Sequence, residues 1–141
     1  MRLSVPACGS IAECHCSAPA FAARIAVAGT SAGANLAVGA ALALAHTPSA
    51  PVAQLLACPV LHGDPARPSR TAFAEGYGLT SQAIEWFIGQ YLTHPDQRRD
   101  PRFAPVLSPD LGTLPPTVLV GAGLDPLPSR TPEAIGPTGS F

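Results

Sequence analysis

Residues 24–45 most strongly limit what this chain can fold into. The sequence RIAVAGTSAGANLAVGAALALA runs from a short apolar stretch, through a glycine-containing corner, into a long apolar stretch. This order predicts a buried strand at Ile25–Ala28, a sharp turn, and a helix at Ala32–His46. Ser31 lies at the corner in a Gly-x-Ser-x-Gly pattern, where a strand-to-helix turn exposes a serine hydroxyl as a nucleophile requires.

The glycines on either side of Ser31 favour such a turn. Gly29 and Gly33 carry no Cβ that would collide where strand and helix crowd together, and glycine tolerates strained backbone dihedrals. The alternative is a purely structural glycine turn. A P-loop is excluded because no Gly-Lys-Ser/Thr follows, and the corner lacks the G-x-G-x-x-G spacing of a dinucleotide site.

The composition points to one α/β domain with a buried interior. The chain has 141 residues, of which 12 % are charged and 47 % hydrophobic, and its formal net charge is −1. That charge gives no electrostatic reason to expect nucleic acid or an anionic membrane as partner, so small neutral ligands fit better. The longest apolar run, Ala34–Ala45, is shorter than the roughly 18 residues of a membrane span. The beginning of the chain has no convincing signal peptide, and we expect a cytoplasmic location.

Four cysteines raise the question of a metal site. Cys8, Cys14 and Cys16 lie near the N-terminus and Cys58 follows a predicted strand. Zinc ligands are normally spaced as C-x-x-C or wider, which the Cys14-His15-Cys16 sequence does not match. We therefore expect free thiols and no metal.

The remaining pattern extends the α/β arrangement. We expect a second buried strand at Val52–Cys58, parallel to the first through a right-handed crossover, and a third at Thr117–Val120. A surface loop or the root of a lid is predicted from His62 to Gly78. Because parallel strands end at one edge of a sheet, Ser31 and Asp125 are predicted to emerge on the same face.

A second helix is predicted after a cap at Thr80 or Ser81 and before Pro95. Its apolar positions fall at helical spacing and form an aromatic-rich stripe: Ile84, Phe87, Ile88, Tyr91 and Leu92. Such a stripe is more often a surface facing the core than a platform for substrate, and we favour the core interpretation.

Several ordered motifs resemble the hormone-sensitive lipase family of α/β-hydrolases, the fold-3 group. RIAVAGTSAGANLA is similar to that family's elbow, LLACPVL to its next strand, and LTSQAIEWFIGQYL to a later helix. DPRFAPVLSPDLGTLPPTVLVGAGLDPL is similar to the segment that carries the acidic triad member. The similarity covers about residues 23–127, so we expect a partial α/β-hydrolase domain at 21–127 between irregular segments at 1–20 and 128–141.

The resemblance implies a role for three residues. Ser31 would be the nucleophile, Asp125 the acid that orients a histidine, and Ala32 the donor of one oxyanion-hole N–H. No cofactor is implied. Thr30 and Ala34 stand where the family usually has Asp and Gly, which is a mild departure.

Two parts of the family's site have no counterpart in the sequence. The triad order is serine, acid, histidine, yet the histidines at positions 15, 46, 62 and 94 all precede Asp125. We expect ordinary surface roles for them. An HGGG-type segment before Ser31 is also missing. We therefore expect a truncated or frame-disrupted product, with little activity of its own because both losses lower the rate.

Two functions follow as hypotheses. The first is a serine hydrolase of the carboxylesterase or lipase type, acting on small, mostly apolar esters through an acyl-enzyme and incomplete in this chain. The second is an inactive α/β-hydrolase remnant that binds small molecules or a partner chain through its exposed sheet edge. The sequence does not indicate the oligomeric state.

Overall fold

The computed structural model describes residues 24–127. The elements follow one another as β1 (Ala26–Thr30), α2 (Ala32–Leu44), β2 (Ala53–Ala57), α3 (Pro68–Ala72), α4 (Ser81–Tyr91) and β3 (Thr117–Val120). Three short 3₁₀ turns, at Pro95–Arg99, Pro105–Leu107 and Leu111–Thr113, lie between α4 and β3. The predicted segments 1–20 and 128–141 lie outside the described residues.

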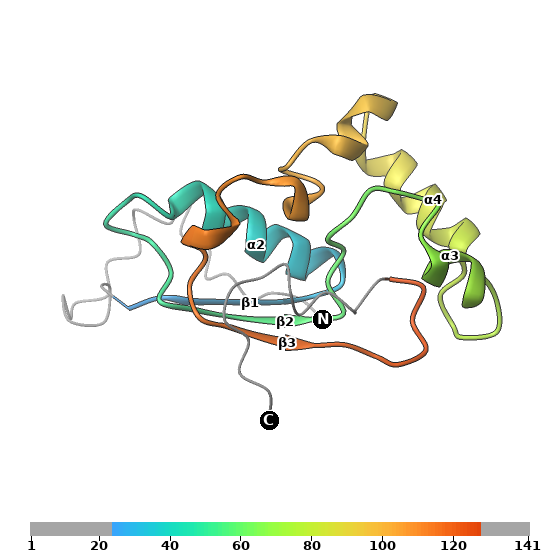
Figure 1. Ribbon diagram of the computed structural model, residues 1–141, viewed down its shortest axis with the longest axis horizontal. Helices are drawn as coiled ribbons and strands as arrows, with labels where there is room; N and C mark the ends of the chain where they lie inside the picture. Colours follow the sequence, from blue (N-terminus) through green and yellow to red (C-terminus); the bar gives the residue numbers. More distant parts are fainter. Residues whose placement is uncertain (1–23, 128–141) are drawn as a thin grey trace.

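The three strands form one parallel sheet in the order β1-β2-β3 (Figure 1). Ala26 of β1 is opposite Ala53 of β2, and Gln54 of β2 is opposite Thr117 of β3. The expected α/β class and the parallel pairing are therefore confirmed. All three strands end at the same edge of the sheet, which is where ligands bind in open α/β folds.

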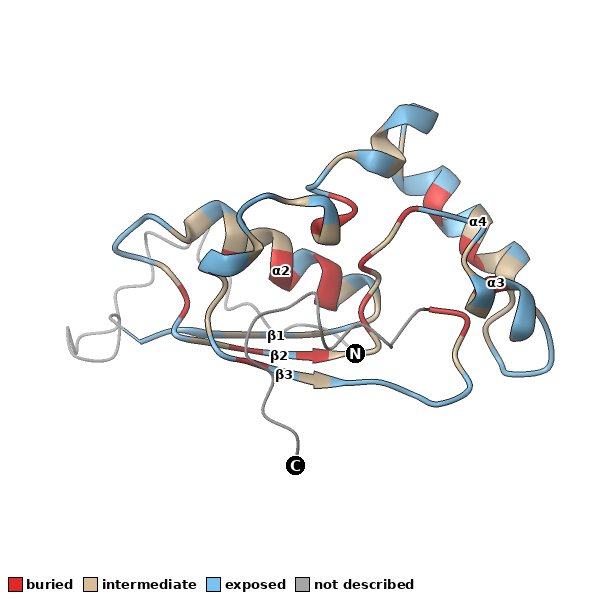
Figure 2. Cartoon of the chain, in the orientation of Figure 1, coloured by how far each residue is buried: buried red, intermediate tan, exposed pale blue. Residues whose placement is uncertain are grey.

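Helix α2 packs along one face of the sheet because small and branched side chains repeat on one side of it. The first cluster consists of five buried residues from α2, β2 and the segment that follows β2: Ala34, Ala37, Val38, Leu56 and Leu61. Figure 2 shows buried segments, in red, on both α2 and β2. Helix α2 is not buried on every side within the described residues, since 56 % of Leu36 is exposed.

Helix α4 begins where the sequence predicts. The Thr80 side chain accepts a hydrogen bond from the Ala83 N–H at 3.0 Å, as an N-cap residue does. Ile84 and Ile88 of α4 are buried and join Phe103 and Leu127 in the second cluster. The core interpretation of the aromatic stripe is wrong for Phe87 and Tyr91, which are 57 % and 59 % exposed.

Charged side chains on α3 and α4 link these helices to the turn that follows them. Glu85 of α4 accepts hydrogen bonds from Arg70 at 3.1 Å and from Arg98 at 2.6 Å. Arg70 belongs to α3, a short helix inside the stretch that was predicted to be a loop. The ion pairs therefore hold α3, α4 and the turn at Pro95–Arg99 together.

The opposite face of the sheet carries no helix of the described part of the chain (Figure 1). Leu55, Val118 and Val120 are each about half exposed there.

Among residues 24–127, no helix combines the length and apolar character needed to cross a membrane.

Candidate active site

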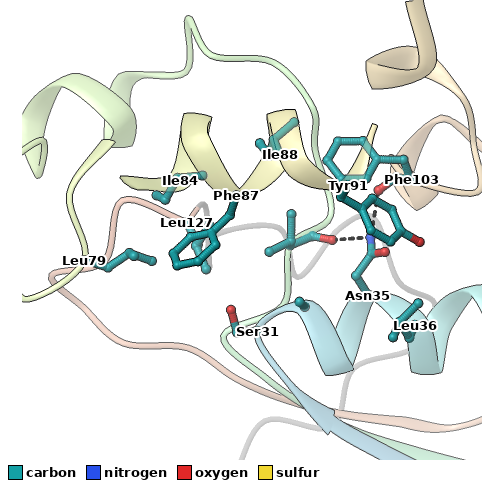
Figure 3. A pocket seen from close by; sticks show the side chains of 12 residues that line it. Ser31, Asn35, Leu36, Leu79, Ile84, Phe87, Ile88, Tyr91, Phe103 and Leu127 are labelled. Carbon is teal, nitrogen blue, oxygen red and sulfur yellow. Dashed lines mark hydrogen bonds between the residues drawn. The ribbon is translucent and has the colours of Figure 1, made fainter. Parts of the chain in front are cut away.

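Ser31 stands at the corner between β1 and α2 in a strained backbone conformation. Its φ of 55° and ψ of −119° lie outside the regions that ordinary residues favour. The Ser31 N–H donates to the Ala57 carbonyl at 2.8 Å, which continues the hydrogen bonding of the sheet past the end of β1. Its hydroxyl makes no capping hydrogen bond to α2 and points toward a pocket (Figure 3). Strain of this kind gathers at functional sites.

The two elbow glycines differ in the space around them. A Cβ built on Gly29 would overlap the carbonyl group of Gly33 and the amide nitrogen of Ala34. The predicted crowding is therefore present at Gly29. A Cβ built on Gly33 would meet no described atom within 4 Å. Within residues 24–127 there is therefore no crowding that would exclude a side chain at position 33.

The Ser31 hydroxyl faces a pocket of about 280 Å³. Its walls are almost wholly apolar and come from α2, from α4 and the segments before and after it, and from the loops that follow β2 and β3 (Figure 3). Leu36 of α2 lies on one side, and Phe87 and Tyr91 of α4 lie on the other. The exposed aromatics that sequence analysis assigned to the core therefore line this pocket.

Ala32 lies at the pocket and at the first position of α2. The N–H groups of a helix's first turn have no partner within the helix, and the helix dipole places partial positive charge there. This position suits the stabilisation of an oxyanion formed at Ser31.

Asp125 follows β3, five residues past the strand end, and so lies beyond the same sheet edge as Ser31. Its carboxylate accepts a hydrogen bond from the Leu127 N–H at 2.8 Å, and Leu127 is part of the pocket wall. Asp125 itself is not among the lining residues. The structure thus brings the two predicted residues to one edge, and their catalytic roles stay predictions.

Cys58 lies between these two residues, directly after the middle strand. Its φ of 43° makes it, with Ser31, one of two non-glycine residues with positive φ in the described range. Its N–H donates to the Val120 carbonyl at 2.7 Å. Burial has the largest effect on the thiol and raises its pKa; the hydrogen bond with the Ala122 backbone lowers the pKa, and the Asp125 carboxylate raises it.

None of the described histidines lines the pocket: His46, His62 and His94 all lie elsewhere. The pKa of His62 is lowered by burial and by the charge of Arg67, and its Nε2 atom is buried without a hydrogen-bond partner. His15 lies outside the described residues. No group of three or more His, Cys, Asp or Glu side chains is placed to hold a metal between residues 24 and 127.

Asn35, which was not among the residues predicted for the site, also lines the pocket. Its side chain is 4 % exposed and donates to the carbonyls of Val60 at 2.6 Å and Phe103 at 2.7 Å. The sequence contained a feature that could have identified this residue, because Asn35 is the one polar side chain of α2. A buried amide in an apolar helix needs hydrogen-bond partners.

Comparisons with known proteins all point to similarity with α/β-hydrolases and ester hydrolases. A family model described as alpha/beta hydrolase fold matches residues 5–134. An ethyl acetate hydrolase of Pseudomonas putida is 40 % identical over 106 residues, which are 74 % of this chain and 33 % of that protein. The carboxylic ester hydrolase LipN of Mycobacterium tuberculosis (strain ATCC 25618 / H37Rv) is 37 % identical over 111 residues, 74 % of this chain and 29 % of that protein.

A solved structure shows the same arrangement. A thermostable carboxylesterase cloned from a metagenomic library is 36 % identical, with a TM-score of 0.68 over 73 % of this chain and 36 % of that one. The chain spans about a third of the length of the curated relatives it matches.

Proposed function

Because this chain belongs to the hormone-sensitive-lipase-like α/β-hydrolases, we propose that it forms the nucleophile-bearing part of a carboxylic ester hydrolase. Its substrates are small esters whose apolar group occupies the pocket beside Ser31. The pocket volume of about 280 Å³ lies at the lower end of the range of small-molecule sites. This assignment rests on the family and on the chemistry of the pocket.

The proposed reaction starts at the Ser31 hydroxyl. Its oxygen attacks the ester carbonyl while its proton passes to a base, and the carbonyl oxygen takes up negative charge near the Ala32 N–H. The alcohol then leaves with a proton, which gives an acyl-enzyme. Water adds to the acyl carbonyl, the acid is released, and the proton returns to Ser31. In the proposal the base is a histidine that Asp125 orients, and none of the described histidines lies at the pocket to fill this role.

The backbone conformation of Ser31 is the structural observation that carries the assignment of this residue as nucleophile. A residue that only connected a strand to a helix would have no need of a φ of 55°, which costs on the order of 1–3 kcal/mol in a non-glycine residue. The Ser31 hydroxyl lies at the pocket, and in the proposal the Ala32 N–H at the start of α2 is the oxyanion donor. This arrangement supports the proposed pairing of a nucleophile with an oxyanion donor.

A fluorophosphonate probe tests the nucleophile directly. We expect a mass increase at Ser31 that is lost in Ser31→Ala and retained in Ser49→Ala, a control at an exposed serine. Hydrolysis of p-nitrophenyl acetate would be followed in parallel. A folded sample that forms no adduct at Ser31 contradicts the proposal.

A non-catalytic binding module is the second candidate, favoured by the pocket lining, in which no described histidine takes part. In that case the pocket binds apolar molecules without acting on them. This second function is supported if the protein binds apolar molecules but Ser31 forms no adduct with the fluorophosphonate probe. The domain boundaries at residues 21 and 127 and the cytoplasmic location stay predictions from the sequence.

A further inference from the structure

Asn35 is unusual for the helix that carries it. The other twelve residues of α2 are alanine, glycine, leucine or valine. Asparagine lowers helix propensity and costs free energy when its amide is buried without partners. An apolar residue would therefore suit the helix better at this position, unless the amide serves contacts outside the helix.

The two contacts of Asn35 both lie outside the helix and far along the chain. One amide hydrogen is directed to the Val60 carbonyl, just after β2, and the other to the Phe103 carbonyl, before β3. Within the described residues, no other α2 side chain hydrogen-bonds to these segments. Figure 3 shows Asn35 between α2 and the opposite side of the pocket.

Those two segments carry the far side of the pocket. Phe103 is buried in the second cluster with Ile84 and Ile88 of α4, and its ring lies 6.0 Å from that of Tyr91. Val60 packs against the same cluster. The two carbonyls that accept hydrogen bonds from Asn35 therefore connect the α4 side of the pocket to α2. Through them, Asn35 contributes to the distance between that side and Ser31.

We propose that Asn35 is a positioning residue that sets the width of the pocket, and thereby the size of the ester group accepted beside Ser31. This inference rests on the proposed function. Asn35 lies one helical turn after Ser31, so it ties the far wall to the same turn that presents the nucleophile. Without its two N–H donors both carbonyls lose their partner, and the wall is free to move away from α2.

The test compares Asn35→Leu with Gln54→Met. Gln54 is a matched control because it is also buried, at 2 % exposure, and its amide donates to Thr117 at 2.7 Å far from the pocket. The measured quantity is the ratio of kcat/KM for phenyl benzoate to that for phenyl acetate. A ratio of this kind does not depend on the fraction of folded enzyme, so a loss of stability alone leaves it unchanged.

We expect the ratio to rise about tenfold in Asn35→Leu, the scale of discrimination that a well-fitted apolar pocket provides, and to stay constant in Gln54→Met. Asn35→Ser, which is too short to reach both carbonyls, serves if the leucine variant does not fold. An unchanged ratio in the Asn35 variants overturns the proposal and leaves Asn35 a structural residue only.

A second measurement separates this proposal from the proposed function. In a Ser31→Ala background, the dissociation constants of toluene and naphthalene are compared with and without Asn35→Leu by ligand-detected NMR. Preference shifted toward naphthalene supports the positioning role even where no ester is hydrolysed. The positioning role is refuted if the ratio of the two dissociation constants is the same with and without Asn35→Leu, or if neither molecule binds.

Discussion

Replacing Gly29 and Gly33 with alanine, one at a time, tests the elbow most directly. At Gly29 the added Cβ overlaps backbone atoms of Gly33 and Ala34, and backbone does not give way as a flexible side chain does. Overpacking typically costs about 1–3 kcal/mol, and we expect Gly29→Ala at or above the upper end of that range. At Gly33 no described atom lies within 4 Å of the new Cβ, and alanine in a helix gains about 0.5–1 kcal/mol over glycine.

Urea unfolding followed by circular dichroism measures both effects. The two variants should differ by at least about 3.5 kcal/mol in the free energy of unfolding, with wild type between them, since a cost of about 3 kcal/mol at Gly29 adds to a gain of about 0.5 kcal/mol at Gly33. Fluorophosphonate labelling of Ser31 should fall in Gly29→Ala and persist in Gly33→Ala. Equal stabilities for the two variants would refute the close packing of strand and helix at this corner.

Three further predictions concern single side chains. The Cys58 thiol, whose pKa is raised by burial and then by Asp125, should react with iodoacetamide only at a pH above that of a free thiol, and Asp125→Asn should shift the rate profile to lower pH. The pKa of His62 is lowered in the folded state, so the unfolded chain binds more protons below pH 6.5; the free energy of unfolding should fall as pH drops through that value, and His62→Gln should flatten this slope in urea titrations at pH 5–8. Thr80→Ala removes the cap that the Ala83 N–H uses and should cost about 1 kcal/mol; thermal unfolding with an unchanged midpoint would show that this cap does not stabilise α4.

Local patterns predicted the sheet because each strand is a short apolar run between turn residues. The third strand is found at Thr117–Val120 as expected, and the parallel order follows from the crossover through α2. The same reasoning placed Ser31 at the strand-to-helix corner. These features depend on residues close together in the sequence, which is why periodicity and turn chemistry could identify them.

The pocket depends on contacts between distant segments, which no local pattern encodes. Helical spacing showed that Phe87 and Tyr91 share a face of α4, but it could not show that this face borders a cavity instead of the core. The role of Asn35 was hidden for the same reason, because Phe103 lies 68 positions away along the chain. Only the fold brings that carbonyl within reach of the amide.

Within residues 24–127 the two apolar clusters are separate, and the pocket beside Ser31 lies between α2 and the second cluster. Segments that bury separate clusters can lose their structure at different free energies. A molecule in the pocket contacts both α2, which carries part of the first cluster, and members of the second, such as Ile84 and Phe103. Ligand occupancy should therefore merge two local openings into a single cooperative transition, in which slow amide exchange spreads from α2 to α4.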